Sequence, residues 1–129
     1  MPKEFLFYIR NGEGGKSTLS ADEHLRFVQQ CEQYIDRLKA QHQLIAAQPL
    51  EKQGCIITKQ DQGWSQTPID TAGTYQVGYY HILAADMDEA IAIAKQNPEF
   101  AFVPSASIEI RPVKTQEEAT GFVYPKGKA

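Results

Sequence analysis

Apolar side chains along the chain fall into short blocks whose length and composition are typical of β-strands. The block from Phe5 to Ile9 is aromatic and aliphatic, and a glycine-rich loop follows it at positions 11–15. Proline, glycine and polar residues separate the other blocks, because such residues interrupt regular structure. The pattern predicts four single strands, over residues 4–10, 44–48, 75–84 and 107–113, and one hairpin with arms over 54–59 and 64–69.

Two further segments carry apolar residues at helical spacing behind a capping signal. Ser20 and Glu23 form a capping box, in which the hydroxyl caps one amide and the carboxylate reaches back to another. A helix over residues 21–41 follows. A second capping box at 86–89 predicts a helix that ends before Pro98. The apolar stripe of the first helix consists of Leu25, Val28, Ile35 and Leu38, widened by Phe27, Cys31 and Tyr34.

The predicted elements follow the order β-α-β, hairpin, β-α-β. This order is the ferredoxin-like βαββαβ pattern with an inserted hairpin, an α+β fold in which two helices cover one face of an antiparallel sheet. Residues 1–113 therefore form one domain, and residues 114–129 form a polar C-terminal tail with an apolar island at 122–124. We expect this tail to pack on its own subunit or on a partner subunit.

The strand pattern also predicts an assembly. Two helices cover only one face of the sheet, yet the strands at 4–10 and 75–84 carry apolar residues on both faces. A solvated face would alternate apolar with polar residues, and a fully exposed apolar face would be a large adhesive surface. We expect a second copy to cover this face, sheet against sheet, about a two-fold axis. The alternative is that Phe122 and Tyr124 of the tail fold over it.

Composition and charge exclude several classes of protein. The chain has 129 residues, 42% of them hydrophobic, and a net charge of −3 at pH 7. One buried core is expected, and the charge argues against nucleic-acid binding. No stretch reaches the roughly 20 apolar residues of a membrane span, and the first apolar block is too short for a secretion signal. We therefore expect a cytoplasmic protein without a membrane segment, in which Cys31 and Cys55 are free thiols.

Familiar catalytic and metal-binding motifs are incomplete in this chain. Gly15, Lys16 and Ser17 resemble the end of a phosphate-binding loop, but Arg10 stands where that motif needs a glycine, so we expect a flexible loop. The three histidines lack the spacing of metal ligands, and no metal or other cofactor is predicted. No GxSxG elbow is present, and Cys31 has no nearby base in the sequence that would activate it.

Several polar and aromatic residues are nevertheless candidates for a small-molecule site. His24 lies one turn into the first predicted helix, where the helix dipole favours a neutral imidazole that can accept a proton. Arg10 and Arg111 end strands that are neighbours in this fold, and both could point at an anionic ligand. Tyr8 and Tyr79 could line a pocket. The alternatives are a surface histidine, solvated strand ends, and tyrosines in the core or in an interface.

Five strings, in their order and spacing, resemble the YCII-related proteins, and in particular their DGPF-type branch. They cover roughly residues 3–113 and read KEFLFYIRN, LSADEHLRFV, LKAQHQLIAAQPL, VGYYHILAADMDEAIAIAKQNP and SIEIRPV. The resemblance implies a dimeric α+β barrel, in which the sheets of two ferredoxin-like subunits face each other and a cleft lies at the sheet–helix edge. Related barrels include muconolactone isomerases, and dehydrochlorination of a chlorinated hydroxyquinol is one activity in the family.

The resemblance also implies a site. His24 matches a family histidine that faces an aspartate after the second helix, a pair proposed as a catalytic dyad. The position of that aspartate is Asn97 here, which cannot ionise but can orient the imidazole ring by a hydrogen bond. The region that matches the DGPF string keeps only its proline and reads Gln66, Thr67, Pro68 and Ile69.

Two hypotheses follow for the function. In the first, the protein is a cofactor-free isomerase or lyase that uses His24 as a general acid or base on a small organic substrate. Arg10 or Arg111 would hold an anionic group of that substrate, and Gln48 and Asn97 would supply hydrogen bonds. In the second, the same fold binds a small molecule without converting it, or serves as a dimerisation module.

Overall fold

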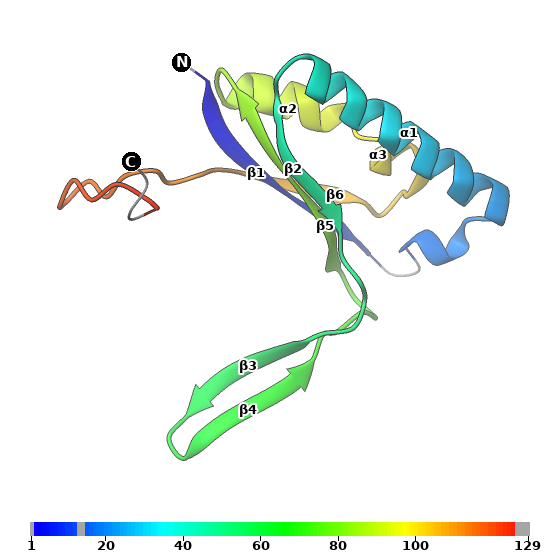
Figure 1. Cartoon of the computed structure of the whole chain (residues 1–129). Helices are drawn as coiled ribbons and strands as arrows, with labels where there is room; N and C mark the ends of the chain where they lie inside the picture. The colour runs from blue at the N-terminus through cyan, green and yellow to red at the C-terminus, as the bar shows by residue number, and fades with distance from the viewer. Residues whose placement is uncertain (1, 13–14, 126–129) are drawn as a thin grey trace.

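The computed structural model describes residues 2–12 and 15–125, and in this part the chain forms a four-stranded sheet, a two-stranded hairpin, two longer helices and two short helical turns (Figure 1). The elements in chain order are β1 (Lys3–Asn11), the 3-10 helix η1 (Gly15–Thr18), α1 (Ala21–Ala40), β2 (Leu44–Pro49), β3 (Cys55–Gln60), β4 (Gly63–Pro68), β5 (Tyr75–Ala84), α2 (Met87–Lys95), α3 (Glu99–Phe102) and β6 (Ser107–Pro112). Every predicted strand and both predicted helices are present, with bounds close to those expected.

The main sheet has the strand order β2-β5-β1-β6, and each neighbouring pair is antiparallel. Helices α1 and α2 connect β1 to β2 and β5 to β6, and both lie on the same face of the sheet (Figure 1). This arrangement is α+β and is compatible with the predicted ferredoxin-like fold. A register shift between Ile9 and Arg10 marks an irregularity near the end of β1.

Helix α1 begins where the sequence predicts, and for the predicted reason. The Ser20 hydroxyl accepts a hydrogen bond from the Glu23 amide at 3.1 Å, and the Glu23 carboxylate accepts one from the Ser20 amide at 2.9 Å. The predicted apolar stripe is wrong at Leu25 and Val28, which are 56% and 46% exposed. At about 100° per residue, Leu25 lies about 120° around the helix from Cys31, and therefore outside the face that packs on the sheet.

The segment between β5 and β6 departs from the prediction. Asp86 caps α2 by accepting a 2.9 Å hydrogen bond from the Glu89 amide, but the Glu89 carboxylate accepts from the Ala85 amide instead of the Asp86 amide. The second capping box is therefore only half formed. Helix α2 ends at Lys95, and the chain then forms the four-residue helix α3, which the sequence pattern does not predict.

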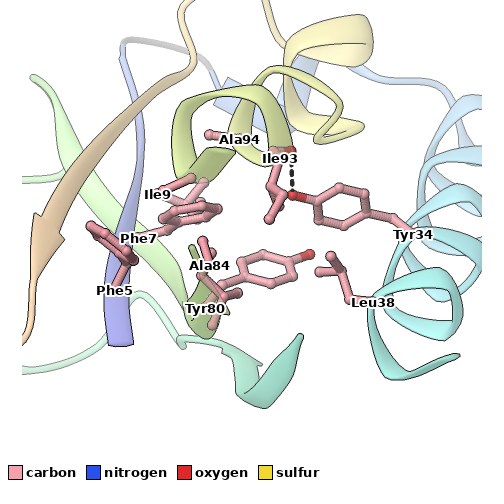
Figure 2. Close-up of a cluster of buried hydrophobic side chains, with 11 residues drawn as sticks. Phe5, Phe7, Ile9, Tyr34, Leu38, Tyr80, Ala84, Ile93 and Ala94 are labelled. Atoms are coloured by element: carbon pink, nitrogen blue, oxygen red, sulfur yellow. Dashed lines mark hydrogen bonds between the residues drawn. The ribbon is translucent and has the colours of Figure 1, made fainter. Parts of the chain in front are cut away.

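Figure 2 shows the core, which lies between the sheet and the two longer helices. The Tyr34 hydroxyl of α1 donates a hydrogen bond to the Ile93 carbonyl oxygen of α2 at 2.8 Å. The Tyr34 ring also meets the Tyr80 ring edge-on, with centroids 5.5 Å apart. A buried hydroxyl needs such a partner, so this bond ties the two helices together above the sheet. Other buried members of the core are Phe5, Phe7, Ile9, Leu38, Ile82, Ala84, Ala90 and Ala94.

The opposite face of the sheet carries no helix of the described chain (Figure 1), and we call it the open face. Alternate residues of β1 and β5 point to it, among them Leu6, Tyr8, Tyr79 and Leu83, and these four are half-buried. The predicted apolar character on both sides of the sheet is therefore present. Two ion pairs also lie here, Arg10–Glu109 at 2.6 Å and His81–Glu4 at 2.7 Å.

The predicted hairpin forms a sheet of its own and projects away from the main sheet (Figure 1). Apart from Ser65, its strand residues are exposed, including Trp64 at 69%. Cys55 on β3 and Cys31 on α1 are both free thiols. No helix in the described residues is long and apolar enough to cross a membrane.

The C-terminal tail folds on itself in its described part, which ends at residue 125. Gln116 forms a β-bridge with Val123, and the rings of Phe122 and Tyr124 pack together with centroids 5.1 Å apart. Both aromatic side chains stay more than 40% exposed, and Figure 1 shows the tail extending away from the sheet. Phe122 and Tyr124 therefore do not cover the open face. Residues 126–129 of the predicted tail lie outside the described residues.

Candidate functional site

A cavity of about 450 Å³ lies between α1 and the sheet. It occupies the end of the sheet where β1 finishes and β5 begins, whereas the core fills the other end. Its volume falls within the roughly 300–1,000 Å³ of sites that hold small organic molecules. Val28 is exposed because it faces this cavity rather than packed side chains. The apolar wall includes Phe27, Val28 and Ile35 of α1 and Ile9, Ala47 and Tyr80 of the sheet.

Gly78 lies in the cavity wall where β2 and β5 run close together. A Cβ atom at this position would lie 3.0 Å from the Gln48 carbonyl oxygen and 3.4 Å from Pro49 Cα. Both are backbone atoms, so a larger residue would displace β2 and reshape this wall. The predicted ligand-binding residues Gln48 and Tyr79 are partners in the ladder next to Gly78, and both border the cavity. The alternation of β5 nevertheless directs the Tyr79 side chain to the open face.

Three polar side chains in the cavity wall form what we call the polar cluster: Asn11 of β1, Lys16 of η1 and Glu99 of α3. Lys16 Nζ lies 2.8 Å from Glu99 Oε2. The Asn11 amide fits between them when it is oriented to satisfy both groups: Nδ2 then donates to Glu99 Oε2 at 2.9 Å and Oδ1 accepts from Lys16 Nζ at 3.1 Å. Asn11 is 1% and Glu99 6% exposed. These mutual partners allow the two charges to stay largely out of water.

Sequence reasoning missed the polar cluster. Lys16 belongs to the glycine-rich segment that was expected to be a flexible loop, and this expectation is wrong because η1 forms there and Lys16 pairs with Glu99. Glu99 lies in α3, a helix too short to leave a periodic pattern. The available signals were weak: Asn11 is a polar residue directly after an apolar strand, and Glu99 is a charge between Pro98 and Phe100.

His24 lines the cavity as an exposed side chain in the first turn of α1. Its ring centroid lies 6.2 Å from that of Phe27. His24 and Cys31 are seven positions apart, so the two lie on one stripe of the helix, with His24 toward its N-terminal end. An imidazole in this place can exchange protons with solvent and with a molecule in the cavity.

Asn97 is buried, at 3% exposure, but the structure does not join it to His24. Its Oδ1 accepts a hydrogen bond from the Glu99 amide at 2.9 Å, and its Nδ2 is buried without an acceptor among the described residues. An asparagine side chain readily turns back to an amide two residues ahead, and here this turn fixes the start of α3. Asn97 therefore positions Glu99, whereas a hydrogen bond to the imidazole ring was expected.

Tyr8, Arg10 and Arg111, the other predicted site residues, do not line this cavity; Tyr8 and Arg10 belong to the open face, as the alternation of β1 shows. Arg10 pairs with Glu109 and lies 5.8 Å from the centre of the Tyr8 ring. Arg111 is opposite Leu6 in the ladder, four positions from the register of Arg10, which separates the two backbones by about 13 Å along the strand. The neighbouring strands expected from the sequence are present, but the arginines do not converge on one anion.

Burial raises the pKa of one thiol and two phenol groups near the cavity. Loss of hydration raises the pKa of the Cys31 thiol to about 11, and the negative charge of Glu99 contributes to this rise. Loss of hydration likewise raises the pKa of Tyr34 and of Tyr80 well above the ordinary value of 10.0, although the nearby Asn97 amide lowers both. At neutral pH these groups donate hydrogen bonds and do not act as bases or nucleophiles.

The cavity wall is suited to an organic ligand. In the described residues, no three His, Cys, Asp or Glu side chains are grouped so that they could hold a metal ion. The wall instead combines an apolar surface with a few polar groups, which is usual for sites that bind small molecules. Among known proteins, no family model and no curated protein matches the chain.

Proposed function

We propose that the chain is a YCII-related, cofactor-free isomerase or lyase that converts a small organic molecule in the cavity, with His24 as general acid or base. The observation that carries this proposal is that one apolar cavity has, in its wall, an exposed imidazole and a half-buried lysine paired with a buried glutamate. The five sequence strings described above support the family. A positioned acid or base accelerates proton transfer by about 10²–10⁴-fold, which suffices for an activated substrate.

The groups around His24 suit proton transfer beside a carbonyl or an anionic oxygen. The imidazole would take a proton from carbon and return one elsewhere on the molecule. Lys16 would stabilise the negative charge that develops on oxygen, and Gln48 would supply a further hydrogen bond. The apolar remainder of the wall excludes water and so strengthens these interactions.

Hydrogen exchange tests this proposal without knowledge of the natural substrate. The protein is incubated with muconolactone in D₂O, and proton NMR measures the uptake of deuterium next to the carbonyl. We expect the wild type to accelerate exchange, and His24→Gln to reduce the acceleration by about 10²-fold or more, because the general base is lost. The matched control is His42→Asn, which changes a histidine outside the cavity wall and should leave the rate unchanged. Equal rates for wild type and His24→Gln would contradict the proposal.

A second candidate function is binding without conversion, and the position of Asn97 favours it. Asn97 bonds to the Glu99 amide, so the ring of His24 lacks the orienting partner that the catalytic hypothesis expects. A binding module would take up a small molecule equally well in wild type and His24→Gln, and neither protein would accelerate exchange.

We also propose that the protein is a homodimer, with the open faces of two copies packed sheet against sheet. Half-buried Leu6, Tyr8, Tyr79 and Leu83 on this face support the proposal, since an uncovered apolar face is rare on a monomer. The tail, which was the alternative cover, keeps its two aromatic rings packed on each other.

A further inference from the structure

The charges in the cavity wall are unbalanced. Among the described residues that line it, Lys16 and Lys52 carry ammonium groups, and Glu99 carries the one carboxylate. Two ammonium groups against one carboxylate give the described part of the wall a net positive charge in an otherwise apolar space. Walls of low dielectric constant focus the field of such charges, so a cavity of this kind attracts anions.

Lys16 is the cation best placed to meet a ligand. Its side chain is 23% exposed, and Nζ lies 2.8 Å from Glu99 Oε2, 3.1 Å from Asn11 Oδ1 and 5.1 Å from the centre of the Phe27 ring. An ammonium group has three N–H donors. Among the described residues, Glu99 and Asn11 account for two of them, which leaves one for an oxygen atom of a bound molecule.

Glu99 and Asn11 hold that cation in place before a ligand binds. Asn11 donates to the Glu99 carboxylate at 2.9 Å, and the Glu99 backbone amide donates to Asn97 at 2.9 Å. A lysine that is already ordered loses little conformational freedom when a ligand binds. More of the favourable free energy of its contact with the ligand therefore contributes to affinity. The Glu99 carboxylate also cancels one positive charge, which favours a ligand with one negative charge over a ligand with two.

We infer that Lys16 anchors the anionic group of a cyclic or aromatic monoanion, whose apolar ring lies against Phe27, Val28 and Tyr80. This inference rests on the proposed small-molecule site and specifies its ligand class: a carboxylate, sulfonate or enolate on an apolar ring. Glu99 and Asn11 are positioning residues, because they act on the ligand through Lys16.

Two fluorescent probes with the same ring skeleton test the anchor. 8-Anilinonaphthalene-1-sulfonate carries one negative charge, and N-phenyl-1-naphthylamine lacks it. Fluorescence titration gives the Kd of each probe. We expect Lys16→Met to raise the Kd of the sulfonate about tenfold and the Kd of the neutral probe less than about twofold, because only a charge-assisted contact is lost. Lys52→Met removes an equal charge from an exposed side chain. It should raise the Kd of the sulfonate less than about threefold, since solvent screens that charge.

Glu99→Gln separates charge from packing. The amide oxygen keeps the shape and the hydrogen bond from Asn11, but Lys16 loses its counter-charge. The Kd of the sulfonate should then fall several-fold, while the Kd of the neutral probe stays unchanged. A loss of structure would instead raise the Kd of the sulfonate. Equal changes for both probes in Lys16→Met, with no gain for the sulfonate in Glu99→Gln, would overturn the anchor.

Val28→Trp, which fills the cavity from an exposed helix position, shows where the probes bind. We expect this variant to raise the Kd of both probes about tenfold, because the indole ring occupies the space in which they bind. If both probes bind this variant as they bind the wild type, the proposed small-molecule site fails and the anchor fails with it. If Val28→Trp raises the Kd of both probes but Lys16→Met changes the two Kd values equally, the small-molecule site is supported and only the role of Lys16 as anchor is overturned.

Discussion

Burial decides which of the two thiols of this protein is reactive. Burial raises the pKa of Cys31 to about 11, whereas Cys55 lies exposed on β3. At pH 8 only about 0.1% of the Cys31 side chain is thiolate, which is the reactive form. We expect iodoacetamide to alkylate Cys55 rapidly at pH 8 and Cys31 at least about tenfold more slowly. Mass spectrometry of Cys55→Ser and Cys31→Ser measures the two rates separately, and equal rates would show that the Cys31 site is solvated.

The same burial makes the folded state sensitive to alkaline pH. The pKa values of Cys31, Tyr34 and Tyr80 are raised in the folded protein, so the unfolded chain releases these protons first. Their contribution to the free energy of unfolding is complete below about pH 9 and is lost as the pH rises through 11. We expect the urea midpoint to fall between pH 9 and pH 11, and to fall less in Cys31→Ala. A midpoint that is constant over this range would contradict the assignment.

At the scale of elements, α1 depends on a local cap. Ser20→Ala removes the hydroxyl that accepts from the Glu23 amide, and it should lower the free energy of unfolding by about 1 kcal/mol. Urea denaturation measures the change. Gln29→Ala, on the exposed side of the same helix, is the matched control and should change it by less than about 0.5 kcal/mol. A smaller loss in Ser20→Ala than in the control would mean that packing alone sets the start of the helix.

The hairpin is a separate element of the fold. Among the described strands, β3 and β4 pair only with each other, and almost all of their side chains are exposed. Replacing residues 54–69 by a short glycine–serine linker should therefore shift the Tm of the main sheet by less than about 4 °C, since little buried surface is lost. Circular dichroism during heating measures this shift. A Tm that falls much further would show that the arm stabilises the main sheet.

At the scale of the whole molecule, the open face is where we expect self-association. Light scattering after gel filtration should give twice the chain mass of 14.5 kDa. Leu6→Lys places a charge on the open face and should yield folded monomer, because an unpaired charge is costly in an apolar interface. Gln29→Lys, on the exposed side of α1, should remain dimeric. A wild type that elutes as a monomer at high concentration would exclude the proposed packing.

The amino-acid sequence by itself determined the strands, the two longer helices and their order. Capping at Ser20 and alternation along β1 act between residues a few positions apart, so both are visible in the string. Element order then restricts the topology, since short connections and antiparallel pairing leave few ways to cover one face of the sheet. His24 was found because it lies on a regular helix, whose period limits the direction of its side chain toward the sheet.

Only the tertiary structure decided which residues share the cavity. Asn11 and Lys16 lie near each other in the sequence, but Glu99 comes from α3, far along the chain, and no local periodicity relates it to the other two. The antiparallel register of β1 and β6 likewise separates Arg10 from Arg111, although both end neighbouring strands. Strand register and the placement of short helices such as α3 depend on the packing of the whole chain. A site built from such contacts therefore appears only once the chain is folded.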